Sequence, residues 1–114
     1  MFNEDYKLLV TLLDMIKEME AIEESFSSRE EFACNDSRIH LGVGFINELE
    51  SIINKISPMT ILASPYLTKE LPLIKRYKEC IFNKDNSINA YKLYDFLTSE
   101  LLEIENGVKE LLTK

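Results

Sequence analysis

Apolar side chains recur at steps of three and four residues over most of the chain. The first stripe lies between Leu8 and Ile22 and is preceded by Asn3, a residue type favoured at a helix N-cap. Two acidic residues follow Asn3, where the helix dipole stabilises negative charge. The pattern predicts a first helix that begins at Asn3 and ends near Phe26.

A short helical turn and a second long helix are predicted next. Ser28 and Glu31 have the spacing of a capping box, which predicts a short turn after Ser28. A second stripe then indicates a helix from about Ser37 to Ile56. Gly42 and Gly44 lie inside it, where glycine weakens a helix, so we expect a neighbouring helix to approach closely there.

Prolines and polar residues divide the second half of the chain. Pro58 ends the second helix, and Pro72 suits the first turn of a third helix that continues to Phe82. A connection with one helical turn is expected between the two prolines. After a polar turn at 83–87, a last helix capped by Ser87 is predicted to continue to about Leu112.

These helices predict the fold class. Only 3 glycines and 3 prolines accompany 46% hydrophobic residues, so the apolar residues must lie in a few long elements. Short connections favour antiparallel neighbours. We therefore expect residues 1–114 to form a single all-α domain, an antiparallel up-and-down bundle of four to five helices.

The two cysteines and the apolar runs bear on the compartment. Cys34 and Cys80 are too few for the disulfide framework of a secreted domain, and no signal-peptide pattern precedes the first helix. The apolar runs are far shorter than the roughly 20 residues that span a bilayer. We expect a cytoplasmic protein in which both cysteines are buried as small apolar residues.

Charge is distributed unevenly around a net charge of −7. The segment 18–36 contains seven acidic residues and one basic residue, whereas 69–92 contains six basic and three acidic residues. Solvated helix faces account for such a difference, and so does a pair of surfaces for partners of opposite charge. The basic segment is the candidate nucleic-acid site, with the residues Lys75, Arg76, Lys78, Asn83 and Lys84.

Carboxylates three or four residues apart suggest one metal-dependent alternative. Such residues share a helix face, so two sets on facing helices are able to hold one Mg²⁺ ion, as in the all-α nucleotide pyrophosphohydrolases. The residues in question are Glu20, Glu23, Glu24, Glu100 and Glu103. The same spacing is common on solvated acidic helices, and the sequence has no phosphate loop, zinc-finger spacing or Ser/His/Asp set. We therefore expect no cofactor.

With the helices placed, the chain resembles the HepT-like branch of the HEPN families, small all-α proteins that form the toxin half of toxin–antitoxin pairs. The likeness extends over nearly the whole length. The segments that carry it are, in order, Ile22-Glu23-Glu24, Ser28-Arg29-Glu30-Glu31-Phe32, Asn35-Asp36, Ile46–Ile53, Leu71–Ile74, a YxxLT-like segment in the last helix and the closing LLEIENGVKELL. The resemblance implies a homodimer and a protein partner encoded nearby, such as a nucleotidyltransferase-type protein.

The ribonuclease motif of active members of these families is incomplete in this chain. The resemblance places Arg76 or Lys78 at its arginine and Asn83 at its histidine. Asparagine does not exchange a proton near neutral pH, so acid–base cleavage of RNA would lose its main participant. The chain is therefore expected to be a non-catalytic interaction module rather than an enzyme.

Three other hypotheses remain open from the sequence. An altered HEPN-type ribonuclease would use the basic residues with His40, the only histidine, brought in from the second helix. The Mg²⁺-dependent pyrophosphohydrolase would use the glutamates named above. An acidic immunity or antitoxin-like protein would cover a basic toxin with its 18–36 segment.

Overall fold

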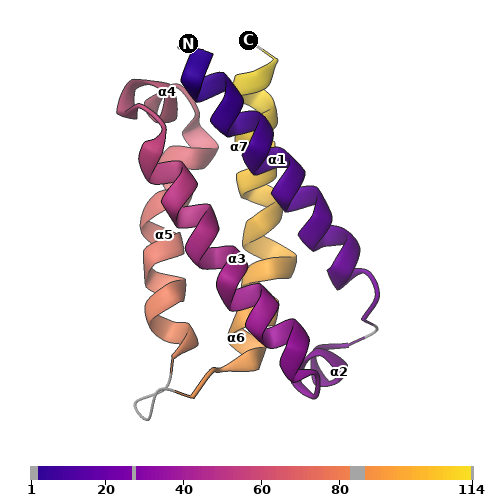
Figure 1. The fold of residues 1–114 in the computed structure, drawn as a ribbon. Coiled ribbons are helices and arrows are strands. Elements are labelled where there is room, and N and C mark those ends of the chain that lie inside the picture. The colour runs from indigo at the N-terminus through magenta and orange to yellow at the C-terminus, as the bar shows by residue number, and fades with distance from the viewer. Residues whose placement is uncertain (1–2, 27, 83–86, 114) are drawn as a thin grey trace.

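A computed structural model describes residues 3–26, 28–82 and 87–113, and almost all of them lie in helices (Figure 1). The elements in chain order are α1 (Asn3–Glu23), α2 (Arg29–Ala33), α3 (Asp36–Lys55), α4 (Pro58–Leu62), α5 (Pro65–Ile81), α6 (Ala90–Asp95), the π-helical η1 (Phe96–Glu100) and α7 (Leu101–Leu112). The predicted all-α antiparallel bundle is confirmed. A single antiparallel bridge, between Phe82 and Ile88, is the extended pairing in the described part of the chain.

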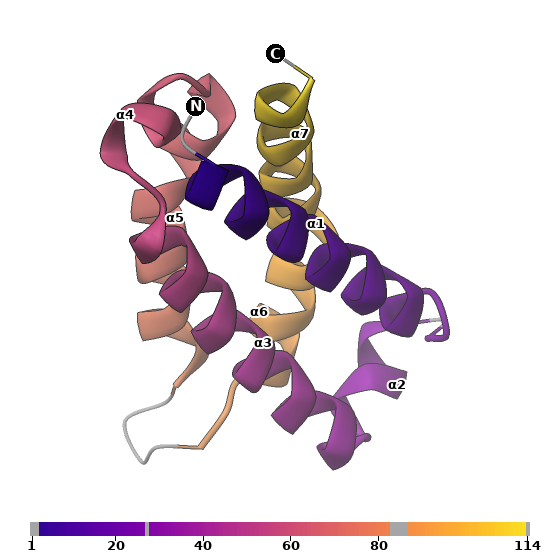
Figure 2. The ribbon, with the colours of Figure 1, turned by 45° about the horizontal axis from the view of Figure 1, so that its top comes forward.

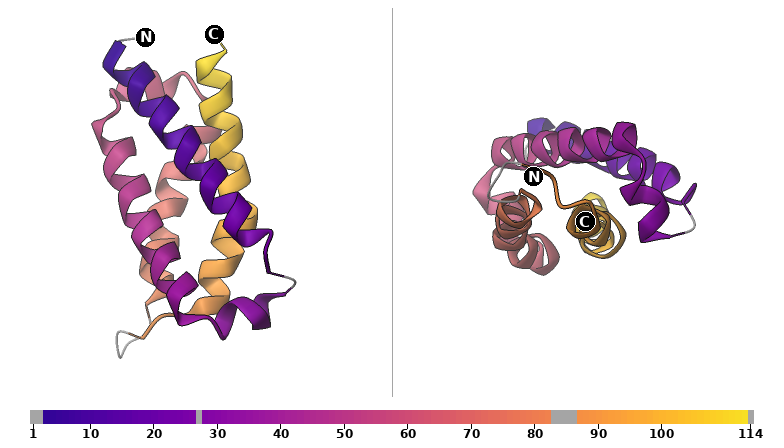
Figure 3. Two further views of the ribbon diagram at one scale, coloured as in Figure 1. Left: turned by 45° about the vertical axis from the view of Figure 1, so that its right-hand side comes forward. Right: turned by 90° about the horizontal axis from the view of Figure 1, so that it is seen from below.

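Four long helical stretches form two layers. In Figure 1, α1 and α3 cross obliquely in front of α5 and of the continuous stretch α6–η1–α7. Seen from below in Figure 3, the two rear helices are nearly end-on while α1 and α3 lie across them. Figure 2 shows both chain ends at the same end of the bundle, opposite α2.

Side-chain caps satisfy the first N–H groups of α2 and α3. The Ser28 hydroxyl accepts the Glu31 N–H at 3.2 Å, and the Asn35 side chain accepts the Arg38 N–H at 3.1 Å. The predicted capping-box turn is therefore confirmed as α2. The second long helix begins at Asp36, one residue before the predicted start.

The predicted start of the third helix is wrong by seven residues. Ser64 caps α5 by accepting the Leu67 N–H at 3.3 Å, and Pro65 occupies its first turn. Pro72, to which the sequence analysis assigned that role, lies inside the helix. Proline has no backbone N–H, so one hydrogen bond to the preceding turn is missing at this position. Pro72 is nevertheless exposed, and the apolar face of the helix around it remains buried.

A π-helical turn interrupts the last long helix. The Leu101 N–H donates to the Phe96 carbonyl, five residues back, so η1 is wider than the α-helical turns on either side. The stretch begins at the Asn89 cap, two residues after the predicted Ser87. Leu93, Leu97 and the apolar residues of α7 still face the core across this turn.

Two glycines permit close helix contacts. A Cβ on Gly42 would lie 3.1 Å from Leu93 Cδ2, which confirms the predicted close approach. A Cβ on Gly44 would meet nothing within 4 Å, so the same prediction is wrong there. Gly107 in α7 is the tightest: a Cβ would stand 2.8 Å from Leu67 Cγ in the first turn of α5.

A buried carboxylate fastens the first helix to the connection between α3 and α5. Asp5 is 4% exposed and accepts the Ser57 N–H at 3.0 Å and the Thr60 hydroxyl at 2.6 Å. These hydrogen bonds to its charged form hold the pKa of Asp5 below the usual value.

Among the described helices, none combines the length and apolar character needed to cross a membrane.

Candidate functional site

A concavity lies between α3 and α5. These two helices make few close backbone contacts with each other, because α3 packs mainly on α1, α2 and α6, while α5 packs on α4, α6 and α7. The space left between them is a groove of 730 Å³. We call it the α3–α5 groove, and its lining residues are Glu50, Ile53, Asn54, Leu71, Ile74, Lys75, Lys78, Glu79 and Phe82.

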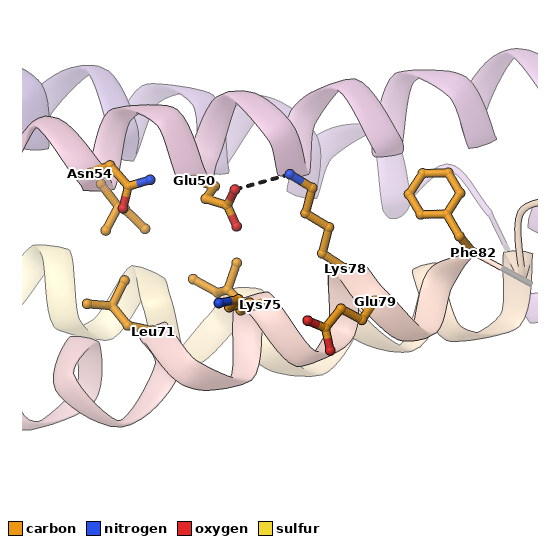
Figure 4. A pocket seen from close by; sticks show the side chains of 9 residues that line it. Glu50, Asn54, Leu71, Lys75, Lys78, Glu79 and Phe82 are labelled. Atoms are coloured by element: carbon orange, nitrogen blue, oxygen red, sulfur yellow. Dashed lines mark hydrogen bonds and ion pairs between the residues drawn. The ribbon is translucent and has the colours of Figure 1, made fainter. Parts of the chain in front are cut away.

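The groove has an apolar floor and charged rims of both signs. Ile53 and Ile74 are each 2% exposed and form part of the core beneath it. Figure 4 shows Lys78 of α5 reaching across to Glu50 of α3, with Nζ and Oε1 3.1 Å apart. Phe82, at the end of the groove, keeps 40% of its surface exposed.

The predicted basic site is only partly assembled by the fold. Lys75 and Lys78 line the α3–α5 groove, whereas Arg76 is exposed and does not line it. Asn83 and Lys84 lie outside the described residues. Because Glu50 and Glu79 stand beside the two lysines, the groove offers balanced charge rather than the positive surface that attracts phosphate.

The predicted glutamates divide between two faces of the last helix. Glu20 and Glu23 of α1 lie on one side, where Glu20 meets Glu105 of α7. Burial, followed by the hydrogen bond and charge of Glu105, raises the pKa of Glu20 to about 7. Protonated Glu20 thus donates to ionised Glu105, whose pKa is lowered by that bond and by Lys109 at 2.9 Å.

A second carboxyl pair lies on the α5 side. Glu70 is 1% exposed, and burial followed by its contact with Glu100 raises its pKa to about 7. The Tyr77 hydroxyl donates to Glu100 Oε1 at 3.4 Å, and burial followed by the charge of Glu100 raises the pKa of Tyr77. Protonated Glu20 therefore joins α1 to α7, and protonated Glu70 joins α5 to η1.

This division separates the proposed metal ligands. Glu20, Glu23 and Glu24 border one pocket with α6 and η1, while Glu100 pairs with Glu70. Among the described residues, no group of three or more histidine, cysteine, aspartate or glutamate side chains is arranged to hold a metal ion. The alternative in which both glutamate sets hold one ion has no support in that part of the chain.

The remaining candidate side chains lie apart from the groove. His40 is exposed and borders a different depression, between α1 and α3, so it does not share a pocket with Lys78. Cys34 and Cys80 are both exposed, which makes the prediction of buried cysteines wrong. Each lies near a helix end, where helical spacing says little about which side faces the core.

Sequence reasoning missed Glu70 and Glu105, the two most buried glutamates. Both lie on the apolar stripe of their helices, with Glu70 between Leu67 and Ile74, and Glu105 next to Ile104. A carboxylate on an apolar stripe is the signal that would have indicated them, because an isolated buried charge is costly and demands a partner.

Comparison of the chain with protein-family models, with curated proteins and with solved structures finds no match.

Proposed function

We propose that this protein is a non-catalytic, HEPN-like helical interaction module, and that a second copy of the chain packs into the α3–α5 groove. The resemblance in helix order motivates the family assignment, and the loosely packed seam between α3 and α5 motivates the surface. The observation that carries the proposal is the composition of that groove, an apolar floor between rims of opposite charge.

The charge pattern suits a symmetric partner. In a twofold dimer the same patch faces itself, so a patch that contains both signs is able to complement its own copy. Each groove contributes Lys75 and Lys78 together with Glu50 and Glu79. We expect a 180° rotation to place lysines of one copy opposite glutamates of the other, while Phe82 and Leu71 supply apolar area.

The positions of the candidate catalytic groups favour this proposal over a nuclease. Lys78 lines the α3–α5 groove, and His40 lines the α1–α3 depression. These two concavities lie on different faces of α3. Acid–base cleavage requires both groups within hydrogen-bond reach of one substrate. We therefore expect the purified protein to leave RNA intact, and RNA cleavage that disappears in His40→Ala would contradict the proposal.

Sedimentation analysis over a range of protein concentrations tests the dimer. The wild-type chain should sediment as a dimer, and Lys78→Glu should shift it to monomer because each groove then faces its copy with an excess of negative charge. Lys69→Glu is the matched control, since Lys69 is exposed on the same helix but does not line the groove. The double variant Glu50→Lys/Lys78→Glu should recover the dimer.

A monomeric wild-type protein at every concentration would contradict the proposed dimer. Equal loss of the dimer in Lys69→Glu would show that net charge, rather than this groove, controls association.

A further inference from the structure

A second pocket lies at the end of α1 and is separate from the α3–α5 groove. It is formed by the last turn of α1 and by the stretch α6–η1–α7, and its volume is 320 Å³. Three acidic and two aromatic side chains line it beside a threonine and two leucines. The polar and aromatic members are Glu20, Glu23, Glu24, Phe26, Tyr94 and Thr98. We call it the Glu23 pocket.

Glu23 has an unsatisfied carboxyl oxygen. The residue is only 8% exposed, and its Oε1 is buried without a hydrogen-bond partner among the described residues. A buried polar atom without a partner is costly, and in native proteins the great majority of such atoms bond to protein, to ordered water or to a bound group. Glu23 therefore offers an acceptor for a donor that enters the pocket.

The aromatic side of the pocket packs on a buried ring. Phe26 packs edge-on against Phe32 with ring centroids 5.5 Å apart, and Tyr94 packs against the same Phe32 at 5.4 Å. Phe32 is 1% exposed, so it anchors both rings that border the pocket. Aromatic faces attract cations, and a flat guanidinium stacks on them better than a compact ammonium does.

The acidic side of the pocket suits a cation whose donors are spread over several atoms. Glu24 contributes one negative charge and Glu23 adds a second when it loses its proton, yet neither belongs to a metal-binding arrangement found among the described residues. A guanidinium has five N–H donors spread over a plane and therefore reaches carboxylates that one metal ion does not bring together.

A guanidinium between an aromatic ring and a carboxylate already occurs within the chain, one helix turn from Tyr94. Arg29 places its guanidinium over the Tyr91 ring at 5.0 Å and donates to Asp95 Oδ2 at 3.2 Å. A guanidinium held between an aromatic face and a carboxylate is thus compatible with this side of the bundle.

We propose that the Glu23 pocket binds a guanidinium cation, with Glu23 as the buried acceptor, Glu24 as a second carboxylate and Tyr94 and Phe26 as the aromatic walls. The cation is either an arginine side chain of a partner protein or a free small guanidinium compound. This site does not depend on the dimer proposed above, so each proposal fails or stands by itself.

Binding is coupled to proton release. Burial, followed by the charge of Glu20, raises the pKa of Glu23 to about 8, so this carboxyl is largely protonated at neutral pH. The acidic groups near Glu20 and Glu23 are Glu24 and Glu105. The basic groups are Lys109 and, near Glu105, Lys17. A guanidinium that replaces the proton should bind more tightly at pH 8 than at pH 6.

Titration calorimetry with two probes tests the site. Agmatine represents a free guanidinium compound, and an acetylated, amidated peptide with one central arginine represents a partner's side chain. At least one probe should bind saturably, with proton release measured by comparing buffers of different ionisation enthalpy. Saturable binding of agmatine alone identifies a small-molecule site, and binding of the peptide identifies a partner's arginine.

Matched variants distinguish the site from general charge attraction. Glu23→Gln should weaken binding by at least about tenfold because the buried carboxylate is lost. Glu18→Gln makes the same side-chain substitution on an exposed residue of the same helix and should leave binding unchanged. Glu24→Gln, an exposed position that does not endanger folding, should also weaken binding.

Two results would overturn the proposal. One is the absence of saturable binding for both probes at pH 8. The other is equal weakening by Glu18→Gln and the two pocket variants.

Discussion

Individual glycines show how much a single methyl group matters at a helix contact. Gly107 of α7 has Leu67, Ser64 and Tyr66 within 3.0 Å of the place where a Cβ would stand. Gly44 of α3 has open space at the same position. The two residues therefore allow one substitution to be tested in opposite environments.

Gly107→Ala should destabilise the protein by about 1–3 kcal/mol, because an added methyl group must displace packed neighbours. Gly44→Ala should stabilise it by up to about 1 kcal/mol, because alanine favours the helix and nothing opposes its side chain. Urea denaturation measures both free energies of unfolding. A gain in stability from Gly107→Ala would mean that α5 and α7 do not approach as closely as described.

The buried glutamates illustrate what residue patterns leave undetermined. Spacing along the chain suggested that Glu20, Glu23 and Glu24 share a site with Glu100 and Glu103. The fold instead pairs Glu20 with Glu105, and Glu70 with Glu100. Such pairs arise between helices, so the angle and register of packing decide them, and neither is encoded in spacing within one helix.

At the scale of the elements, boundaries with a specific cap were predictable. Ser28 marks the start of α2 because its hydroxyl accepts the Glu31 N–H, which has no partner within the helix. Asn3 is the first residue of α1, as the sequence predicted. The start of α5 was missed because two prolines, Pro65 and Pro72, both suit a first turn. The Ser64 cap before Pro65 was the local signal that distinguishes them.

Pro72→Ala should stabilise the protein by about 1–3 kcal/mol, since it restores an N–H inside α5 and removes the ring from the preceding turn. Pro65→Ala is the matched control at the first turn, where the missing N–H has no cost, and it should change stability little or lower it slightly. Thermal or urea unfolding provides the comparison. Equal effects of the two substitutions would contradict the assigned start of α5.

The π-helical turn is a feature that periodicity did not predict. Apolar residues on both sides of η1 continue the buried stripe, so steps of three and four describe the sequence whether the turn is α- or π-helical. Thr98, within this turn, donates its hydroxyl to the Tyr94 carbonyl at 2.9 Å. The widened turn also borders the Glu23 pocket, the site proposed above for a guanidinium cation.

At the scale of the whole molecule, the carboxyl pairs make stability depend on pH. Glu20, Glu23 and Glu70 have folded-state pKa values of about 7, about 8 and about 7, above the ordinary value of 4.5. Between these values the folded protein holds more protons than the unfolded chain, so the free energy of unfolding falls as pH rises. Asp5 acts oppositely, and its contribution is lost as pH falls through its lowered pKa.

We therefore expect stability to be greatest at mildly acidic pH and to decline between about pH 5 and pH 8. Glu70→Gln should flatten this decline, because the amide still donates to Glu100 but carries no proton to lose. Chemical denaturation at several pH values measures the slope for the variant and the wild type. Identical slopes would mean that Glu70 is not protonated in the folded protein.

The chain ends lie together at one end of the bundle, near the start of α1 and the end of α7 (Figure 1). A host protein would therefore be able to carry this bundle as an insertion in one of its loops, with both links leaving from the same side. In such a fusion the α2 end points away from the host, which would display the Glu23 pocket toward the surroundings.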